Sequence, residues 1–195
     1  MTDPAQVVET LRAGGIVLLP TDTVYGLAVH PEHDDAPARL FALKQRPLTR
    51  NIPVMVASAE QAEALGADVT AAARQLLGAF SPGPLTLALG LDPQRAPAWL
   101  AGRDEVAVRI PDDPFLLEVL RQAGPLLVTS ANLHGQETPE ACADVLAQLD
   151  GAPDLTVDDG PRATVPSTLV NCNLPEPRVE RVGAVPADQI AKVLV

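Results

Sequence analysis

Two segments, IVLLPTDTVYGLAVHPE (16–32) and LFALKQRPLTRNIPVMV (40–56), form the stretch on which the rest of the chain depends. The first begins with four apolar residues, whose short length and β-branching favour a buried strand, and runs into Thr21-Asp22-Thr23, a turn with three side-chain oxygens. The second indicates a helix that ends at the basic triplet KQR (44–46) before Pro47, followed by another apolar strand. Because polar side chains stand here directly beside core residues, we expect the remaining chain to shape a cleft around this stretch.

Strands and helices alternate along the chain, but without the strict repetition of a parallel βαβ fold. Two hairpin-like passages near the end favour a mixed sheet. We therefore predict an α/β fold, and because no repeat or linker divides the chain, we expect one domain over residues 1–195. The expected strands are 16–19, 24–29, 52–57, 85–89, 106–110, 125–129, 155–157, 167–170 and 178–182, and the expected helices are 4–13, 38–44, 59–65, 69–79, 115–122, 139–149 and one from 186.

The composition excludes several classes of protein. With 14 basic and 25 acidic residues the net charge is −11, which argues against a broad surface that follows nucleic-acid phosphates. Aromatic residues make up only 3% of the chain, so base stacking on aromatic side chains is not the expected mode of binding. The two cysteines form no CxxC pair, the first residues are not those of a signal peptide, and no apolar run reaches the roughly 20 residues of a membrane span. We therefore expect a soluble, cytoplasmic protein with reduced cysteines.

The standard motifs of phosphate loops and serine hydrolases are missing. The sequence contains no GxxxxGK[ST], no GxGxxG after a strand and no GxSxG. His30 and His33 form an HxxH pair, but Pro31 keeps them from sharing a helical face, so we interpret them as loop residues and expect no metal ligated by the protein. Paired acids such as Asp158-Asp159 are interpreted as caps and solvated turns.

A local reversal of charge marks residues 36–51, where four basic residues occur without an acid. A solvated helix end explains such a cluster, since cations favour the C-terminal end of a helix dipole. An anion site explains it as well. Lys44 is one of only two lysines in the chain, and its compact ammonium beside the forked guanidinium of Arg46 suits a phosphate or a carboxylate. Composition alone leaves both interpretations open.

Hydroxyl-bearing side chains lie at the ends of three expected strands. Thr21, Thr23 and Tyr25 follow the first strand, residues 129–132 (TSAN) end another, and residues 166–168 (PST) open a third. Each group taken singly is explained by capping of the local backbone. Ligands of α/β proteins bind at strand ends, however, so together with the basic cluster these groups favour a pocket for a small, oxygen-rich, anionic ligand.

The motifs PTDTVYGL, KQRP, SPGPLT, VAVRIP, TSAN and PSTLV, in this order, resemble the YrdC/TsaC family, the L-threonylcarbamoyladenylate synthases, from about residue 8 to residue 185. The resemblance implies an open, twisted α/β sheet with helices packed on it and a concave, positively lined cleft. It also implies ATP, bicarbonate and L-threonine as substrates, with Mg²⁺ carried by the ATP phosphates. The products would be pyrophosphate and threonylcarbamoyl-AMP, which a downstream transferase uses to modify tRNA, so contact with tRNA itself is at most indirect.

The matched motifs also imply roles for particular residues. Thr21, Tyr25, Arg109 as a carboxylate clamp, and Ser167 would bind threonine and bicarbonate. The expected nucleotide-binding residues are Lys44, Arg46, Thr86, Ser130, Asn132 and Arg181, of which Lys44 and Arg46 are also the expected catalytic cations. Because a carbamate intermediate is labile in water, we further expect the segment 157–166 to close over the cleft.

The chain departs from the family pattern at a few positions. Residues 48–52 (LTRNI) differ from those that usually follow KQRP, which leaves Arg50 and Asn51 without an implied role. Leu133-His134 stands where a small residue is common, and Asn171 stands where an acid often occurs. Because the chain ends at residue 195, we expect it to lack the additional C-terminal domain of longer members. The alternative is an RNA-binding or nucleotide-binding protein of the same fold without this activity.

Overall fold

The computed structural model describes residues 2–33, 35–47 and 51–194. The strands are β1 (Val17–Leu19), β2 (Gly26–Val29), β3 (Val54–Met55), β4 (Leu85–Gly90), β5 (Glu105–Arg109), β6 (Leu126–Ser130), β7 (Leu155–Thr156), β8 (Thr168–Asn171) and β9 (Arg178–Arg181). The helices are α1 (Pro4–Arg12), α2 (Ala36–Leu43), α3 (Ala59–Ala64), α4 (Ala71–Phe80), the short 3₁₀ helix η1 (Ala98–Leu100), α5 (Pro114–Ala123), α6 (Cys142–Gln148) and α7 (Ala187–Val193). None of the helices in these ranges combines the length and the hydropathy that a membrane crossing requires.

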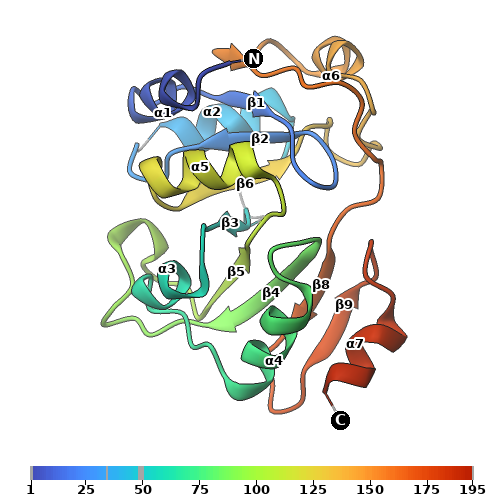
Figure 1. Cartoon of the computed structure of the whole chain (residues 1–195). Helices are drawn as coiled ribbons and strands as arrows, with labels where there is room; N and C mark the ends of the chain where they lie inside the picture. Colours follow the sequence, from blue (N-terminus) through green and yellow to red (C-terminus); the bar gives the residue numbers. More distant parts are fainter. Residues whose placement is uncertain (1, 34, 48–50, 195) are drawn as a thin grey trace.

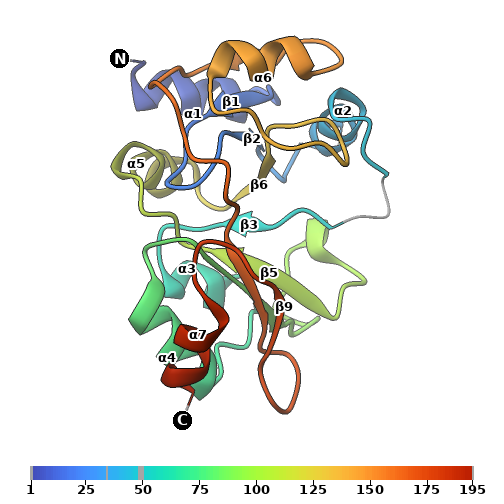
Figure 2. The same ribbon diagram turned by 90° about the vertical axis from the view of Figure 1, so that its right-hand side faces the viewer.

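The strands form one continuous sheet in the order β7-β1-β2-β6-β3-β5-β4-β8-β9. The pairs β1–β7, β3–β5 and β4–β8 are parallel and the other neighbours are antiparallel, so the predicted mixed sheet is confirmed. The two-residue strand β3 joins the halves of the sheet, because it pairs with β6 on one side and β5 on the other. Figures 1 and 2 show α1, α2, α5 and α6 around one half, and α3, α4 and α7 around the other.

Among the element boundaries that differ from the prediction, the starts of α6 and β2 share one physical reason. A helix start at Pro139 is wrong: α6 begins at Cys142, because Thr138 is held in the preceding loop by a 3.3 Å hydrogen bond from its Oγ1 to Asn132 Oδ1. The second strand begins at Gly26 rather than at residue 24, because the carbonyl of Val24 accepts a 2.7 Å hydrogen bond from a threonine in the preceding turn. Side-chain hydrogen bonds to nearby groups compete here with regular structure.

The two faces of the sheet are covered differently. One core cluster, which includes Leu27 and Val108, packs α2, α3, α4, α6 and α7 against one face. A second cluster packs α1 and α5 against the other face through residues such as Leu19, and it extends as far as Met55 and Val128. Met55 and Val128 belong to this second cluster and also line a cavity. On the same face of the sheet, β4, β5 and β8 are not covered by any of the helices described above and are open to that cavity.

Candidate active site

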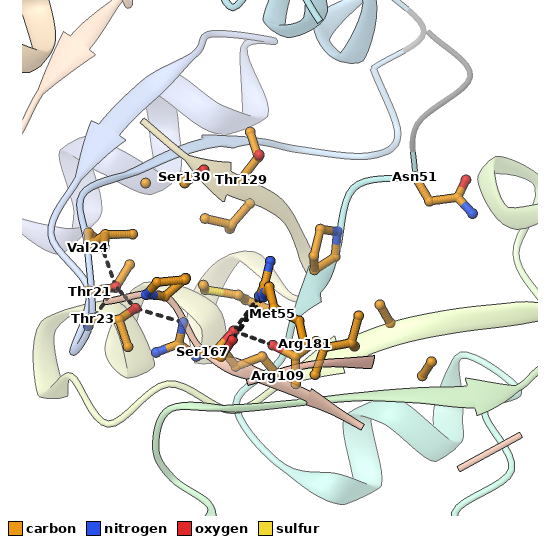
Figure 3. Close-up of a pocket in the computed structure, with 18 of the residues that line it drawn as sticks. Thr21, Thr23, Val24, Asn51, Met55, Arg109, Thr129, Ser130, Ser167 and Arg181 are labelled. Carbon is orange, nitrogen blue, oxygen red and sulfur yellow. Dashed lines mark hydrogen bonds between the residues drawn. The ribbon is translucent and has the colours of Figure 1, made fainter. Parts of the chain in front are cut away.

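A cavity of about 480 Å³ lies on the open face of the sheet (Figure 3). Its walls come from the turn after β1, from β3 to β6, and from β8 and β9. Most of the predicted site residues line it: Thr21, Arg46, Thr86, Arg109, Ser130, Ser167 and Arg181. Tyr25, Lys44 and Asn132 are not among the lining residues. Side chains from distant parts of the sequence thus converge on one concave space, which is the usual form of a ligand site.

The floor of the cavity follows from the alternation of side chains along β5. Alternate residues, from Glu105 through Ala107 to Arg109, line the cavity, whereas the two valines between them are buried in the core on the other face. Ala88 of β4 pairs with Ala107 and lines the cavity beside it. The small alanine side chains leave room for a ligand between the charged ends of β5.

The turn after β1 is held together by its own hydroxyl groups. Thr21 Oγ1 donates to the carbonyl of Val24 at 2.7 Å and accepts from the amide of Thr23 at 3.1 Å. Thr21 and Thr23 are each only 2% exposed, and both line the cavity. The hydroxyl group of Thr21 therefore caps the local backbone, and both threonines also lie in the wall of the cavity.

Arg109 is fixed in place by three oxygen atoms. Its Nη2 donates to Asp22 Oδ1 at 2.6 Å. Its Nη1 donates to Thr23 Oγ1 at 2.9 Å (Figure 3). Its Nε donates to the carbonyl of Gly83 at 3.2 Å. The ion pair with Asp22 is buried, with 6% of the Arg109 side chain and 10% of the Asp22 side chain exposed. The guanidinium group is thus oriented before any ligand arrives.

Ser167 and Arg181 form a second fixed unit of the cavity wall. Arg181 Nη2 donates to the Ser167 carbonyl at 2.9 Å and to Ser167 Oγ at 3.2 Å. Ser167 Oγ also lies 2.8 Å from Thr86 Oγ1. Partial burial lowers the pKa of Arg181, and the positive charge of Arg109 lowers it further. Arg109 and Arg181 therefore lie close enough for their charges to interact, and both line a cavity that suits anionic groups.

The basic triplet forms the C-terminal cap of α2. The amides of Arg46 and Gln45 donate to the carbonyls of Phe41 and Ala42, each at 2.9 Å, in the pattern of a Schellman motif. Gln45 has a φ of 50°, the left-handed conformation that glycine usually supplies at this position. Arg46 lines the cavity, whereas Lys44, two residues before it, does not.

Lys44 is instead enclosed by oxygen atoms of the turn after β6. Its Nζ donates to the carbonyls of Ser130 and Asn132, the latter at 2.5 Å, and lies 3.4 Å from Asn132 Oδ1. The residue is 1% exposed, so a solvated helix end does not describe it. Burial, with a smaller effect of the Arg46 charge, lowers the pKa of Lys44 to about 7. Lys44 therefore ties the end of α2 to the turn that carries Ser130.

Tyr25 lies away from the cavity and binds the segment after β7. The residue is fully buried, and its hydroxyl lies 2.7 Å from the carbonyl oxygen of Gly160 and 3.2 Å from Asp158 Oδ1. The hydroxyl also accepts a 3.2 Å hydrogen bond from the amide of Asp159. These contacts give Tyr25 a structural task that its place in the PTDTVYGL motif did not reveal.

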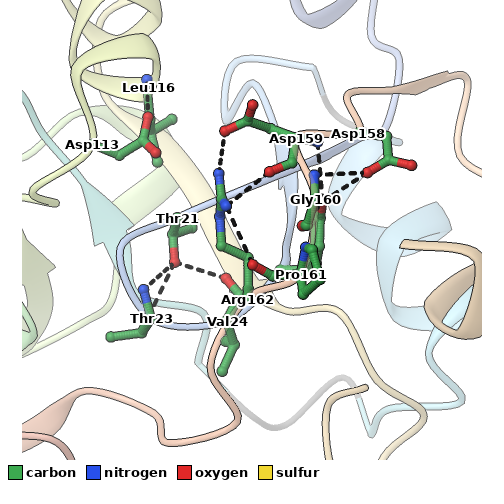
Figure 4. Close-up of polar contacts among 11 residues, drawn as sticks. Thr21, Thr23, Val24, Asp113, Leu116, Asp158, Asp159, Gly160, Pro161 and Arg162 are labelled. Atoms are coloured by element: carbon green, nitrogen blue, oxygen red, sulfur yellow. Dashed lines mark hydrogen bonds and ion pairs between the residues drawn. The ribbon is translucent and has the colours of Figure 1, made fainter. Parts of the chain in front are cut away.

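The segment 157–166 is therefore anchored at Tyr25. Arg162 pairs with Asp159 within the segment (Figure 4). The guanidinium carbon of Arg162 lies 6.0 Å from the centroid of the Tyr25 ring. Of this segment, only Pro166 lines the cavity. The closing motion expected for the segment remains a prediction.

Several residues that line the cavity, or contact a residue that lines it, carried no recognisable signal in the sequence. Asp22 stands in a turn rich in oxygen atoms, and nothing local indicates that it pairs with Arg109. Glu105 follows from stepping back four residues from Arg109 along the strand, because alternate side chains share a face. Asn51, which had no implied role, lines the cavity, and its carbonyl accepts a 2.9 Å hydrogen bond from Arg46 Nη2. Thr129 and Glu180 line it as well.

Carboxylates and imidazoles do not gather at the cavity. Among the residues that the structure describes, no group of three or more His, Cys, Asp or Glu side chains is placed to hold a metal ion. Glu105 and Glu180 are the acids that line the cavity within the described ranges. Glu180 Oε1 accepts a 2.9 Å hydrogen bond from Asn171.

An open α/β sheet whose uncovered face carries arginines and hydroxyl groups around a cavity has the form expected of a site for small anionic ligands. The sequence model of the Sua5/YciO/YrdC family, described as "Telomere recombination", matches residues 9–183. The chain belongs to this family, so the resemblance drawn from its motifs is confirmed.

Individual relatives agree with this assignment. Threonylcarbamoyl-AMP synthase of Bacillus subtilis is 36% identical over 193 residues, which are 97% of this chain and 56% of that protein. Putative threonylcarbamoyl-AMP synthase of Mycobacterium tuberculosis H37Rv is 35% identical over 190 residues, 96% of this chain and 87% of that protein. This chain therefore spans little more than half the length of the B. subtilis relative.

Solved structures confirm the predicted fold. Sua5 of P. abyssi complexed with L-threonine aligns with a TM-score of 0.88 and 31% identity, over 98% of this chain and 57% of that chain. YciO of E. coli aligns with a TM-score of 0.85 and 27% identity, over 96% of this chain and 92% of that chain. The open, twisted mixed sheet of this chain is thus that of the Sua5 and YciO structures.

Proposed function

We propose that this protein is an L-threonylcarbamoyladenylate synthase, which converts ATP, bicarbonate and L-threonine into threonylcarbamoyl-AMP and pyrophosphate. The observation that carries the proposal is the convergence of Arg46, Arg109 and Arg181 with threonine and serine hydroxyls on one cavity. The names of the relatives and the threonine bound to P. abyssi Sua5 support the choice of substrates.

The reaction needs no covalent enzyme intermediate. The threonine amine attacks the bicarbonate carbon and water leaves, which gives a carbamate. A carbamate oxygen then attacks the α-phosphorus of ATP, the bond from the α-phosphorus to its bridging oxygen breaks, and pyrophosphate departs. The protein must hold two anionic reactants in line and balance the charge that develops on them, so the catalysis is positioning and electrostatic stabilisation.

The two fixed arginine units divide this task. Arg109, held beside the Thr21 turn, faces the amino-acid side and takes the threonine carboxylate. Arg181, with Ser167 and Thr86, binds a phosphate group. Arg46, which follows the end of α2, contributes a further positive charge to the cavity. Mg²⁺ arrives with ATP and is held mainly by the phosphates, with Glu105 and Glu180 the cavity-lining carboxylates that suit an oxygen-binding cation.

Lys44 and Asn132 act through the turn after β6. The Lys44 ammonium binds the carbonyls of Ser130 and Asn132, and Ser130 Oγ donates to Asn132 Oδ1 at 2.5 Å. This network shapes the cavity wall at Ser130, the side of the cavity that binds the nucleotide. Lys44 thus supports nucleotide binding from behind the wall.

The product serves as an activated donor for a downstream tRNA threonylcarbamoyl transferase in the cytoplasm. Direct binding of tRNA by this chain is not part of the proposal, because its net charge of −11 opposes a surface that follows nucleic-acid phosphates.

Pyrophosphate release from ATP tests the proposal. Release should require both threonine and bicarbonate, and Arg181→Gln should slow it by roughly 10²–10³-fold, by analogy with the loss of one oxyanion donor. Arg121→Gln is the control, because Arg121 lies on α5, does not line the cavity and has 58% of its side chain exposed. Release that is independent of threonine or bicarbonate, or no release at all, would overturn the proposal.

A further inference from the structure

We propose that Asp22 determines which anion the cavity accepts at Arg109: by neutralising this arginine, it makes a subsite for a net-neutral amino acid that disfavours phosphate. Asp22 acts through Arg109 and is therefore a positioning and specificity-determining residue. The inference rests on the proposed function in naming threonine as the amino acid and ATP as the phosphate ligand used in competition.

The first observation is the geometry of the Asp22–Arg109 pair. Asp22 Oδ1 lies 2.6 Å from Arg109 Nη2, and both side chains are at least nine-tenths buried. The second oxygen, Asp22 Oδ2, is buried and makes no hydrogen bond to any part of the chain that the structure describes. Arg109 is therefore the group that balances the Asp22 charge, and the two together carry no net charge.

The second observation is the contrast with Arg181. The guanidinium of Arg181 donates only to neutral groups, the carbonyl and hydroxyl of Ser167, and within the described residues it forms no ion pair. Its positive charge is therefore available to a ligand. One cavity thus contains a neutralised arginine and a charged arginine.

These two environments select different ligands. A zwitterionic amino acid has no net charge near neutral pH, and its carboxylate accepts hydrogen bonds from oriented N–H groups without needing a net positive site. Its ammonium also tolerates the negative field of Asp22. A phosphate carries between one and two negative charges at neutral pH, so its removal from water must be offset by net positive charge, which Arg181 offers and the neutral pair does not.

The phosphate test compares wild type with Asp22→Asn by calorimetric titration with inorganic phosphate and with L-threonine. Asparagine can still accept the Arg109 hydrogen bond but does not cancel its charge. The ratio of phosphate affinity to threonine affinity should rise by at least about tenfold, because an uncompensated charge within a few ångströms of the ligand acts strongly in a partly buried site. The double variant Asp22→Asn with Arg109→Gln restores neutrality and should lose the gain in phosphate affinity.

Asp144→Asn provides the matched control, because it makes the same change at an exposed position of α6, away from the cavity lining. An unchanged ratio in a folded Asp22→Asn protein would overturn the inference, as would an equal gain in the control. Breaking a buried ion pair can prevent folding. In that case competition on the wild type decides: phosphate should displace ATP but leave threonine bound, and displacement of threonine would refute the assignment.

These titrations need no turnover, so they separate the inference from the proposed function. Failure of pyrophosphate release in the wild type counts against the synthase activity alone. The change in phosphate affinity between wild type and Asp22→Asn still reports the charge of the Arg109 subsite.

Discussion

The ammonium nitrogen of Lys44 lies 2.5 Å from the carbonyl oxygen of Asn132, so the lysine of the basic triplet is occupied by the protein itself. Its charge is buried, and its pKa is about 7, compared with 10.5 for an exposed lysine. Between pH 7 and pH 10.5, Lys44 therefore carries a proton in the unfolded chain that it has lost in the folded chain. This difference predicts that the free energy of unfolding rises with pH over that window.

The first prediction is that Lys44→Met removes this pH dependence. In the wild type the Lys44 contribution to the free energy of unfolding should increase by at most about 1.4 kcal/mol per pH unit from pH 7 towards pH 10. Urea denaturation at pH 7, 8 and 9 measures the slope. Lys192→Met, at the exposed lysine that pairs with Asp188, should keep the wild-type slope. Identical slopes for wild type and Lys44→Met would show that Lys44 keeps its proton throughout.

How far the sequence predicts this site depends on the range of the interactions. Thr21 was found because a hydroxyl-rich turn at a strand end is a local pattern, whereas Arg109 was predicted only from the VAVRIP motif of the family resemblance. The different positions of Lys44 and Arg46 were not predicted, because the left-handed Gln45 turns the chain between them and the usual glycine is absent there. Helical periodicity places both residues at the end of α2 but does not say which of the two cations enters the cavity.

Long-range side-chain contacts are the part that no local pattern encodes. Tyr25 reaches Gly160, which is 135 positions further along the chain. Asp22 reaches Arg109 across 87 positions. The motifs predicted that these segments belong to one site, but the particular partners depend on strand order, in which β5 is separated from β1 by three other strands.

The second prediction concerns the hydroxyl pair of Thr86 and Ser167. These residues are 3% and 5% exposed, and their oxygens lie 2.8 Å apart. Thr86→Val and Ser167→Ala should each destabilise the protein by about 1–3 kcal/mol, because the remaining hydroxyl is left without this partner in a buried place. The double variant should cost less than the sum by about 1 kcal/mol. Urea unfolding of the four proteins measures this coupling, and strictly additive losses would contradict it.

The third prediction concerns the close approach of Gly183 to the segment that carries Ser167. A Cβ at residue 183 would lie 2.2 Å from the Pro166 carbonyl oxygen and 2.6 Å from that of Ser167. Gly183→Ala must therefore push Ser167 out of place, at a cost of about 1–3 kcal/mol and with weaker ATP-dependent turnover. Thermal unfolding and pyrophosphate release measure the two effects.

Gly78→Ala is the control for this substitution. Gly78 lies in α4, and a Cβ there would meet no atom within 4 Å. Alanine should stabilise the helix by roughly 0.5–1 kcal/mol without affecting turnover. If Gly183→Ala behaves like Gly78→Ala, the close packing at Ser167 has no functional consequence.

The last prediction is that the hydroxyl of Tyr25 keeps the segment 157–166 closed against the turn after β1. Tyr25→Phe keeps the buried ring but removes the contacts to Gly160 and Asp159, and should cost about 1 kcal/mol. Most residues of this segment are exposed. In the variant, the segment should therefore open locally more often than the whole protein unfolds. Hydrogen exchange should therefore accelerate at the amides of Asp159 and Gly160, while peptides from α1 in the same sample serve as the internal reference. Uniform acceleration across both regions would mean that Tyr25 stabilises the whole fold and does not specifically anchor this segment.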